Sequence, residues 1–304
     1  MQRKLRRYSY SALNTYISCS LKYYFQYVLR IYFTEVPIAA FLGQCVHDTI
    51  EYYHLNDNKP TLSNLINYFT NKFEEGFLLD DIKTHFPMHK QYSYDMGLRA
   101  INQFITSEKM SQAKPFIYMD DKKGEIPAVE LYFKVPVNED VYLAGLIDLA
   151  ENRNKKLIVI DHKTSSKDYT DLFIDTSLQL TIYAYAARYL LKQGKFKGTK
   201  AKKEYKVVYN IFIKPKSKSE LKIIERKISN EDIDNMISTV EQVDTSAQNN
   251  IFIPANNDQC EAFGGCAYKE ICVMYQKRKG IFKSNILDVD MLKNMYKEGV
   301  EVKS

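Results

Sequence analysis

The 304-residue sequence predicts an α/β fold in which one mixed central sheet is flanked by helices. Three observations predict it. Four segments with helical spacing come first, strands with a period of two follow, and a helix then separates them from two further strands. Because this order alternates strands with helices, we expect one α/β core with a helical insertion, and not two independent domains.

The first half of the chain is predicted to be helical. Residues 11–30 and 39–54 place apolar side chains on one face at helical spacing. Thr61 has the side chain of an N-cap and precedes a third stripe of apolar residues. The fourth predicted helix covers residues 94–107.

The second half supplies the sheet. Val129, Leu131, Phe133 and Val135 alternate with polar residues, which is typical of a strand with one buried face. Residues 141–151 and 156–161 read as two more strands, and the polar residues 152–154 between them suit a hairpin turn. The remaining predicted elements are a helix at 172–191, strands at 206–213 and 221–228, a helix from about Asn230, and a cysteine-rich tail.

We therefore expect a single domain over residues 1–304. Its parts are an N-terminal helix at 8–35, a helical region at 39–125, an α/β core at 126–230, and a C-terminal helix and cysteine-rich tail at 231–304.

Two of the strands each deliver a carboxylate close to their ends. Strands of a hairpin lie about 4.8 Å apart, so Asp148 and Asp161 can converge on one cation. Lys163 follows two residues after Asp161 and returns to the same face. Two carboxylates, a lysine and water suit metal-assisted phosphodiester hydrolysis. The alternative is a surface hairpin with ordinary Asp–Lys pairs, but four consecutive apolar residues before Asp161 favour a site at the end of a buried strand.

Two helices add further candidates. His47 and Glu51 are four residues apart and share a helix face, and a neutral imidazole can bind a metal. Gln179 and Tyr183 are also four apart and can reach the sheet edge. Each pair alone is common on helices, where such residues are more often structural.

Together these residues resemble the RecB-like branch of the PD-(D/E)xK nuclease superfamily. The resemblance runs from Ser9 to Cys272. Its motifs in chain order are Ser9-Tyr-Ser-Ala-Leu13 with Tyr16 and Cys19, Gly43 with His47, Gly145-Leu-Ile-Asp148, Asp161-His-Lys163, and Gln179-Leu-Thr-Ile-Tyr183. One departure is Ser20, where relatives often have proline, and this affects a turn.

The resemblance implies a restriction-endonuclease-like sheet and a role for each matching residue. By resemblance, Mg²⁺ or Mn²⁺ is held by His47, Asp148, Asp161 and the backbone carbonyl of His162. Lys163, Asp148 and Asp161 are implied to be catalytic. Gln179 and Tyr183 are implied to position the DNA strand or the site. No role is carried over to Glu51.

The five cysteines point to a second site. Cys260, Cys266 and Cys272 are separated by five residues each, and clustered cysteines in an intracellular chain favour a metal over disulfides. Similarity to the cluster-containing subgroup implies Cys19 as the fourth ligand of a 4Fe–4S cluster; this subgroup includes the AddB nuclease domain, CRISPR spacer-acquisition exonucleases and related phage nucleases. A structural zinc is the alternative, although the short C-x₂₋₄-C spacing is missing. Cys45 is predicted to be a core residue.

The resemblance implies a metal-dependent DNA nuclease, most simply a single-stranded DNA exonuclease. The alternative is an accessory DNA-binding subunit of a helicase–nuclease or integrase complex; RNA as substrate is a weaker one. A phosphate-cradling G-x-x-x-x-G-K-[ST] motif is absent from the sequence, so ATP-driven unwinding would need a helicase partner. A net charge of +6 permits nucleic acid as a partner. Without a run of about 20 apolar residues or a secretory signal, we expect a cytoplasmic protein with no membrane partner.

Overall fold

The computed structural model describes residues 5–33, 36–78, 82–83, 88–153, 156–165, 169–198, 205–213, 220–255, 260–261, 265–277 and 300–302. The chain divides into two compact units. Unit 1 comprises Met1–Arg7 and Pro37–Met236, and unit 2 comprises Tyr8–Val36 and Ile237–Ser304. A single domain over residues 1–304 stays a prediction.

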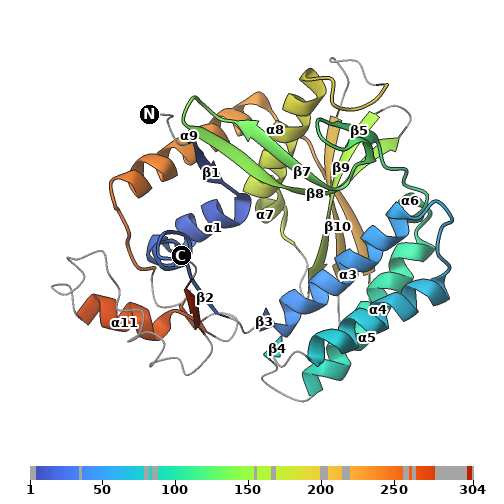
Figure 1. The fold of residues 1–304 in the computed structure, drawn as a ribbon, viewed down its shortest axis with the longest axis horizontal. Coiled ribbons are helices and arrows are strands. Elements are labelled where there is room, and N and C mark those ends of the chain that lie inside the picture. The colour runs from blue at the N-terminus through green and yellow to red at the C-terminus, as the bar shows by residue number, and fades with distance from the viewer. Residues whose placement is uncertain are drawn as a thin grey trace. The chain divides into compact units, whose positions relative to one another are not determined.

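The sheet of unit 1 is mixed, as the sequence predicts (Figure 1). Its strand order is β1-β8-β9-β10-β11, with β7 also paired to β8. Strands β9 and β10 are parallel, whereas β7–β8, β8–β9 and β10–β11 are antiparallel. The strands are β1 (Arg6–Tyr8), β7 (Val129–Pro136), β8 (Val141–Arg153), β9 (Lys156–Ser165), β10 (Tyr205–Ile213) and β11 (Glu220–Arg226).

Strands β8 and β9 pair antiparallel, which confirms the two neighbouring strands predicted at residues 141–151 and 156–161. Arg153 pairs with Lys156, so β8 extends into the polar segment expected to form the turn. Asn152 and Arg153 belong to the strand, and Asn154 lies outside the described residues.

Three helices of unit 1 pack together beside the sheet (Figure 1). They are α3 (Ile38–Leu55), α4 (Leu62–Phe77) and α5 (Met88–Thr106). Thr61 caps α4 as predicted, because its hydroxyl accepts the amide of Asn64 at 3.3 Å while the Asn64 side chain accepts the amide of Thr61 at 3.0 Å. Helix α5 begins at Met88, earlier than the predicted start at Tyr94.

These three helices pack closely around phenylalanine rings. A Cβ atom added to Gly97 would lie 2.0 Å from the ring of Phe69, so only glycine permits this approach. Phe73 and Phe104 are fully buried in the same cluster, together with Cys45. Cys45 is thus a core residue, as predicted.

The connection from β9 to β10 is helical, as a parallel pair requires. The prediction of one helix over 172–191 is wrong, because α7 (Asp171–Asp175) ends before α8 (Leu178–Lys192) begins. Ser177 accepts the amide of Leu180 at 3.3 Å through its hydroxyl, and this N-cap starts a new helix.

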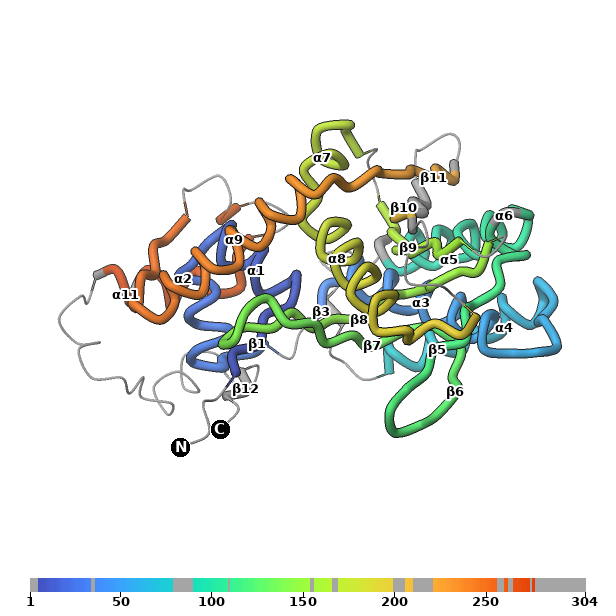
Figure 2. The backbone as a smooth tube through the Cα atoms, turned by 90° about the horizontal axis from the view of Figure 1, so that it is seen from above, coloured from blue at the N-terminus to red at the C-terminus, as the bar shows by residue number. Residues whose placement is uncertain are grey.

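Smaller elements complete unit 1. Strands β5 (Ile117–Asp120) and β6 (Gly124–Pro127) form a hairpin that the sequence did not predict, and Figure 2 shows it beside the main sheet. Its turn is polar, since the Asp120 carboxylate accepts the amides of Lys122 at 2.9 Å and Lys123 at 2.8 Å. The remaining short elements are α6 (Glu108–Ser111), β3 (Val36–Pro37) and β4 (Ile82–Lys83).

Unit 2 is mainly helical. The prediction of one helix over 11–30 is wrong, because Cys19 is extended, with φ −161° and ψ 100°, and ends the first helix. The described elements are α1 (Tyr10–Ser18), α2 (Ser20–Tyr23), a π-helix (Tyr24–Val28), β2 (Ile31–Phe33), α11 (Lys269–Lys277) and β12 (Val300–Val302). Helix α9 (Asn230–Gln248) begins in unit 1 and belongs to unit 2 from Ile237 onward. None of the helices in the described part of the chain is both long and apolar enough to cross a membrane.

Candidate active site

Three side chains of unit 1 bring potential metal ligands together. His47 lies on α3, Glu130 on β7 and Asp148 on β8, and their ligand atoms lie within 4.8 Å of one another. The Nδ1 atom of His47 is 3.3 Å from a carboxylate oxygen of Asp148. The Nε2 atom of His47 lies 2.6 Å from the backbone carbonyl oxygen of His162. An imidazole, two carboxylates and a carbonyl oxygen therefore meet at one place.

A second group surrounds Asp161, which is buried at the end of β9. One of its carboxylate oxygens accepts hydrogen bonds from the Gln179 amide at 2.9 Å and the Tyr183 hydroxyl at 3.2 Å. The other oxygen is 2.7 Å from the Lys163 ammonium group. Lys163 therefore shares a face with Asp161, as the strand period predicts, and both residues of the Gln179–Tyr183 pair reach the sheet.

His162 links the two groups. Its backbone amide donates to a carboxylate oxygen of Asp148 at 2.7 Å, and its carbonyl oxygen contacts the His47 ring nitrogen. The His162 ring is buried, and burial together with the neighbouring His47 holds the pKa of the ring well below its usual value. The ring is therefore neutral at physiological pH, and the backbone of His162, not its ring, contacts the acidic group.

The carboxylates of the first group are electrostatically strained. Burial, followed by the charge of Asp148, raises the pKa of Glu130 to about 7. Burial, followed by the charge of Asp161, raises the pKa of Asp148 to about 6. Asp148 keeps this raised pKa although His47 and the His162 amide act to lower it. Simultaneous ionisation of Glu130 and Asp148 is thus disfavoured.

The neighbouring carboxylates favour the ionised form of Lys163, whereas they disfavour ionisation of one another. Burial alone lowers the pKa of its ammonium group, but the contact with Asp161 outweighs burial and the net pKa is raised. The charged form of Lys163 is therefore maintained beside the carboxylates. Burial and the charge of Asp161 also raise the pKa of Tyr183 well above its usual value, so its hydroxyl stays protonated and can donate.

Glu130 is the residue that the sequence analysis missed. Its alternation with Val129 and Leu131 indicated an ordinary outward-facing residue. The observed register places it opposite Asp148, between the pairs Val129–Leu149 and Leu131–Ile147. Its φ of +44° is unusual for a residue other than glycine and is typical of strained positions at functional sites. Strand pairing would have been needed to find it, since no local motif marks it.

The cysteines of unit 2 form a separate group. Cys19, Cys260, Cys266 and Cys272 are all partly buried and free. The sulfur of Cys19 accepts the backbone amides of Lys22 and Ala255, both at 3.4 Å. Cys19, Cys266 and Cys272 pack against one apolar cluster, whose buried members are Leu21, Phe25, Ile31, Tyr268 and Ile271.

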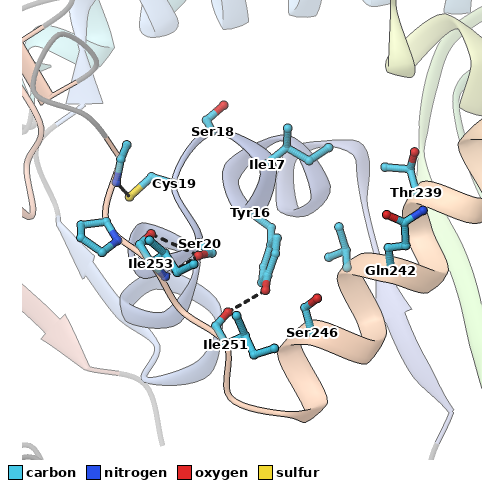
Figure 3. A pocket seen from close by; sticks show the side chains of 13 residues that line it. Tyr16, Ile17, Ser18, Cys19, Ser20, Thr239, Gln242, Ser246, Ile251 and Ile253 are labelled. Atoms are coloured by element: carbon cyan, nitrogen blue, oxygen red, sulfur yellow. Dashed lines mark hydrogen bonds between the residues drawn. The ribbon is translucent and has the colours of Figure 1, made fainter.

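The chain turns between the C-terminal cysteines. The amide of Cys266 donates to the carbonyl of Cys260 at 2.8 Å, and Gly265 has a φ of +97° that favours glycine. Gly264, also expected in this turn, lies outside the described residues. A cavity of about 500 Å³ adjoins Cys19, lined by segments of α1, α9 and residues 251–255, with neutral side chains only (Figure 3).

Comparison with known proteins agrees with this architecture. The family model for the PD-(D/E)XK nuclease superfamily matches residues 7–273. A crystal structure from Eubacterium rectale, described as a "putative exonuclease", aligns with a TM-score of 0.51 and 12% identity over 93% of this chain and 91% of that chain. The structure of SSO0001 aligns with a TM-score of only 0.33 and 15% identity, over 75% of this chain and 94% of that one, and carries no argument. No curated protein sequence matches.

The fold and the acidic site define a protein of the nuclease class. The family match covers most of the sequence, and the mixed sheet flanked by helices has the fold of the first solved structure. The chain belongs to the PD-(D/E)XK nuclease superfamily.

Proposed function

We propose that the protein is a metal-dependent DNA nuclease, and more narrowly an exonuclease acting on single-stranded DNA. One observation carries the proposal: the ligand atoms of His47, Glu130 and Asp148 lie within 4.8 Å of one another. Asp148 in turn interacts electrostatically with Lys163. A cation site next to a maintained ammonium group suits the cleavage of a phosphodiester, whose charge grows in the transition state.

The residues fit a hard divalent cation. Carboxylate and carbonyl oxygens are the ligands that Mg²⁺ and Mn²⁺ prefer, and an imidazole is compatible with Mn²⁺. The raised pKa values of Glu130 and Asp148 report repulsion that a bound cation would relieve. We assign His47, Glu130, Asp148 and the His162 carbonyl as the ligands. Asp161 as a direct ligand stays a prediction, since both its oxygens engage protein groups.

Each remaining residue has a distinct part in the proposed reaction. A bound divalent cation supplies charge stabilisation at the phosphate and a more acidic water. Lys163 holds its proton and offsets negative charge developing on the phosphate oxygens. Gln179 and Tyr183 fix the Asp161 carboxylate, and Asp161 in turn fixes the Lys163 ammonium group.

The preference for single-stranded ends rests on the resemblance in the sequence. Helices α4 and α5 follow His47 in the chain and pack closely against α3, so this helical region suits a roof under which a strand threads. A helicase or other DNA-processing partner, and a cytoplasmic location, stay predictions.

The decisive experiment compares degradation of end-labelled linear single-stranded DNA with Mn²⁺ or Mg²⁺ by the wild type and Lys163→Ala. We expect metal-dependent loss of DNA with the wild type only. Lys197→Ala is the matched control, because Lys197 is exposed and pairs with Glu125 at 2.7 Å on the surface. Equal inertness of all three proteins would favour the accessory-subunit alternative, and cleavage of circular single-stranded DNA would contradict exonuclease action.

We further propose that Cys19, Cys260, Cys266 and Cys272 bind a structural 4Fe–4S cluster. Structural zinc is the alternative, but Cys260, Cys266 and Cys272 lack the short C-x₂₋₄-C spacing that is typical of zinc sites. The Cys19 sulfur accepts two backbone amides, and hydrogen bonds to the ligand sulfurs are a feature of iron–sulfur sites.

Iron and acid-labile sulfide should be measured in protein purified without oxygen. We expect about four of each per chain in the wild type, and loss of iron with a lower melting temperature in Cys19→Ser. Cys45→Ser, which changes a core cysteine outside the set, should keep its iron. Bound zinc, or full iron content in Cys19→Ser, would contradict the proposed ligands.

A further inference from the structure

The sheet face that carries Glu130 and Asp148 continues into an exposed aromatic surface. Along β7 the side chains alternate, so Tyr132 and Lys134 share the face of Glu130 while Leu131 and Phe133 are buried on the other. On β8 the same alternation places Leu146 on the face of Asp148.

Tyr132 and Leu146 are direct partners across the two strands. Both are unusually exposed for their type, with 51% of Tyr132 and 48% of Leu146 accessible. The ammonium group of Lys134, the next residue outward on β7, lies 4.3 Å from the ring centre of Tyr142. We call these four residues, Tyr132, Lys134, Tyr142 and Leu146, the Tyr132 surface.

The position of the Tyr132 surface relative to the acidic group is fixed by the strand. Tyr132 is two residues from Glu130, and Leu146 is two residues from Asp148, which corresponds to about 7 Å along each strand. This separation is comparable with one nucleotide of an extended strand. A strand whose phosphate lies at the carboxylates would therefore pass a neighbouring base over Tyr132.

We propose that the Tyr132 surface binds the single-stranded DNA next to the cleaved bond, with one base stacked on Tyr132 and a phosphate beside Lys134. The proposal rests on the proposed nuclease function and names residues that select the substrate. An unpaired base has a free face for stacking, whereas a base inside a duplex is already stacked.

The chemistry of the surface favours this occupant over a protein partner. One exposed aromatic ring and one exposed leucine are far less than the roughly 800 Å² per partner that a stable protein interface buries. A ring beside an ammonium group is the combination that binds single-stranded nucleic acid. The surface also continues into the acidic group without a break in either strand.

The test measures the Kd of fluorescent oligothymidine by anisotropy, in the Lys163→Ala background and without divalent cation so that the DNA stays intact. Tyr132→Ala should raise the Kd by about tenfold, the stacking contribution of one base. Tyr132→Phe should bind as Tyr132 does, because the ring is kept. Leu146→Ser should raise the Kd by a smaller factor.

The matched control is Tyr92→Ala on α5, where a tyrosine with 49% exposure lies outside this face. It should leave the Kd unchanged. A blunt duplex should bind with the same Kd before and after Tyr132→Ala.

Four results would overturn the proposal: an unchanged Kd in Tyr132→Ala, an equal loss in Tyr132→Phe, an equal loss for duplex, or oligouridine bound more tightly with the same dependence on Tyr132. Failure of the nuclease function is read separately, from cleavage by the wild type. If the wild type cleaves no DNA but its single-strand binding still depends on Tyr132, the nuclease function is contradicted and the binding surface is supported.

Discussion

The two halves of the candidate site balance their charges in different ways. Both oxygens of Asp161 have protein partners, namely Gln179 and Tyr183 on one and Lys163 on the other. Glu130 and Asp148 face each other instead, and their pKa values are raised to about 7 and about 6. The charge of Asp161 is therefore balanced by protein groups, whereas the Glu130–Asp148 half keeps a charge repulsion that the proposed cation would relieve.

The largest effect is expected for Asp161→Ala, which tests whether protein groups balance the charge of Asp161. The substitution leaves the Lys163 ammonium group without its partner and removes the acceptor of Gln179 and Tyr183. We expect the free energy of unfolding to fall by about 3 kcal/mol, measured by urea denaturation. Asp121→Ala is the control, since Asp121 pairs with Lys195 but its side chain is 86% exposed. The free energy of unfolding should fall by less than about 1 kcal/mol in Asp121→Ala. Equal losses in the two variants would contradict the stabilisation of Asp161 by its buried partners.

The opposite result is expected for Asp148→Asn. Ionising a carboxyl group whose pKa is raised costs about 1.4 kcal/mol per unit. Without divalent cation the variant should therefore be more stable than the wild type by roughly 2 kcal/mol at neutral pH. Added Mn²⁺ should raise the melting temperature of the wild type and leave that of Asp148→Asn nearly unchanged. A less stable variant, or equal stabilisation of both proteins by Mn²⁺, would contradict a cation site at Asp148.

His54 sharpens the comparison, because burial is the largest cause of its pKa shift and it lies outside the acidic group. Burial, followed by the charge of Lys59, lowers the pKa of His54 to about 3, and neither ring nitrogen has a hydrogen-bond partner among the described residues. Below its unfolded pKa of about 6.5 the unfolded chain binds a proton that the folded protein does not, so stability is lost as pH falls.

Between pH 7 and pH 5 this loss should reach about 2 kcal/mol. The difference in urea midpoint between the wild type and His54→Leu isolates it from other groups. The same difference at both pH values would show that His54 is protonated in the folded protein.

The smallest effect is expected for Tyr183→Phe. It removes the hydrogen bond from the Tyr183 hydroxyl to Asp161 and the bond that this hydroxyl accepts from the Gln179 amide at 3.1 Å. The bond from Gln179 to Asp161 and the contact of Asp161 with Lys163 remain. The free energy of unfolding should fall by about 1 kcal/mol, and DNA cleavage should decrease less than in Lys163→Ala. A loss as large as that of Asp161→Ala would mean that Tyr183 holds the carboxylate alone.

Periodic patterns account for the parts of the fold that the sequence predicted. The alternation in β7, the apolar run before Asp161, and the spacing of four between Gln179 and Tyr183 depend only on local geometry. Each correctly placed its residues on a face of a strand or helix. The Thr61 cap is equally local, because its two hydrogen bonds lie within three residues.

The missed features depend on contacts between distant segments. Glu130 joins the acidic group through its register with β8, and nothing within β7 specifies that register. The break at Cys19 is similar, since an amide from Ala255 as well as one from Lys22 meets its sulfur. Helical spacing on both sides of Cys19 therefore predicted a continuous helix where the structure has two.

The proposed site is assembled from parts made at very different times during synthesis. His47 lies on α3, while Asp161 and Lys163 follow more than a hundred residues later, and α8 follows them. Translation proceeds from the N-terminus, so a ribosome that has made the whole helical region has not yet made the acid–lysine pair. A nascent chain therefore carries no complete site until α8 has been made, and hydrolytic capacity would begin only once α8 has folded onto the sheet.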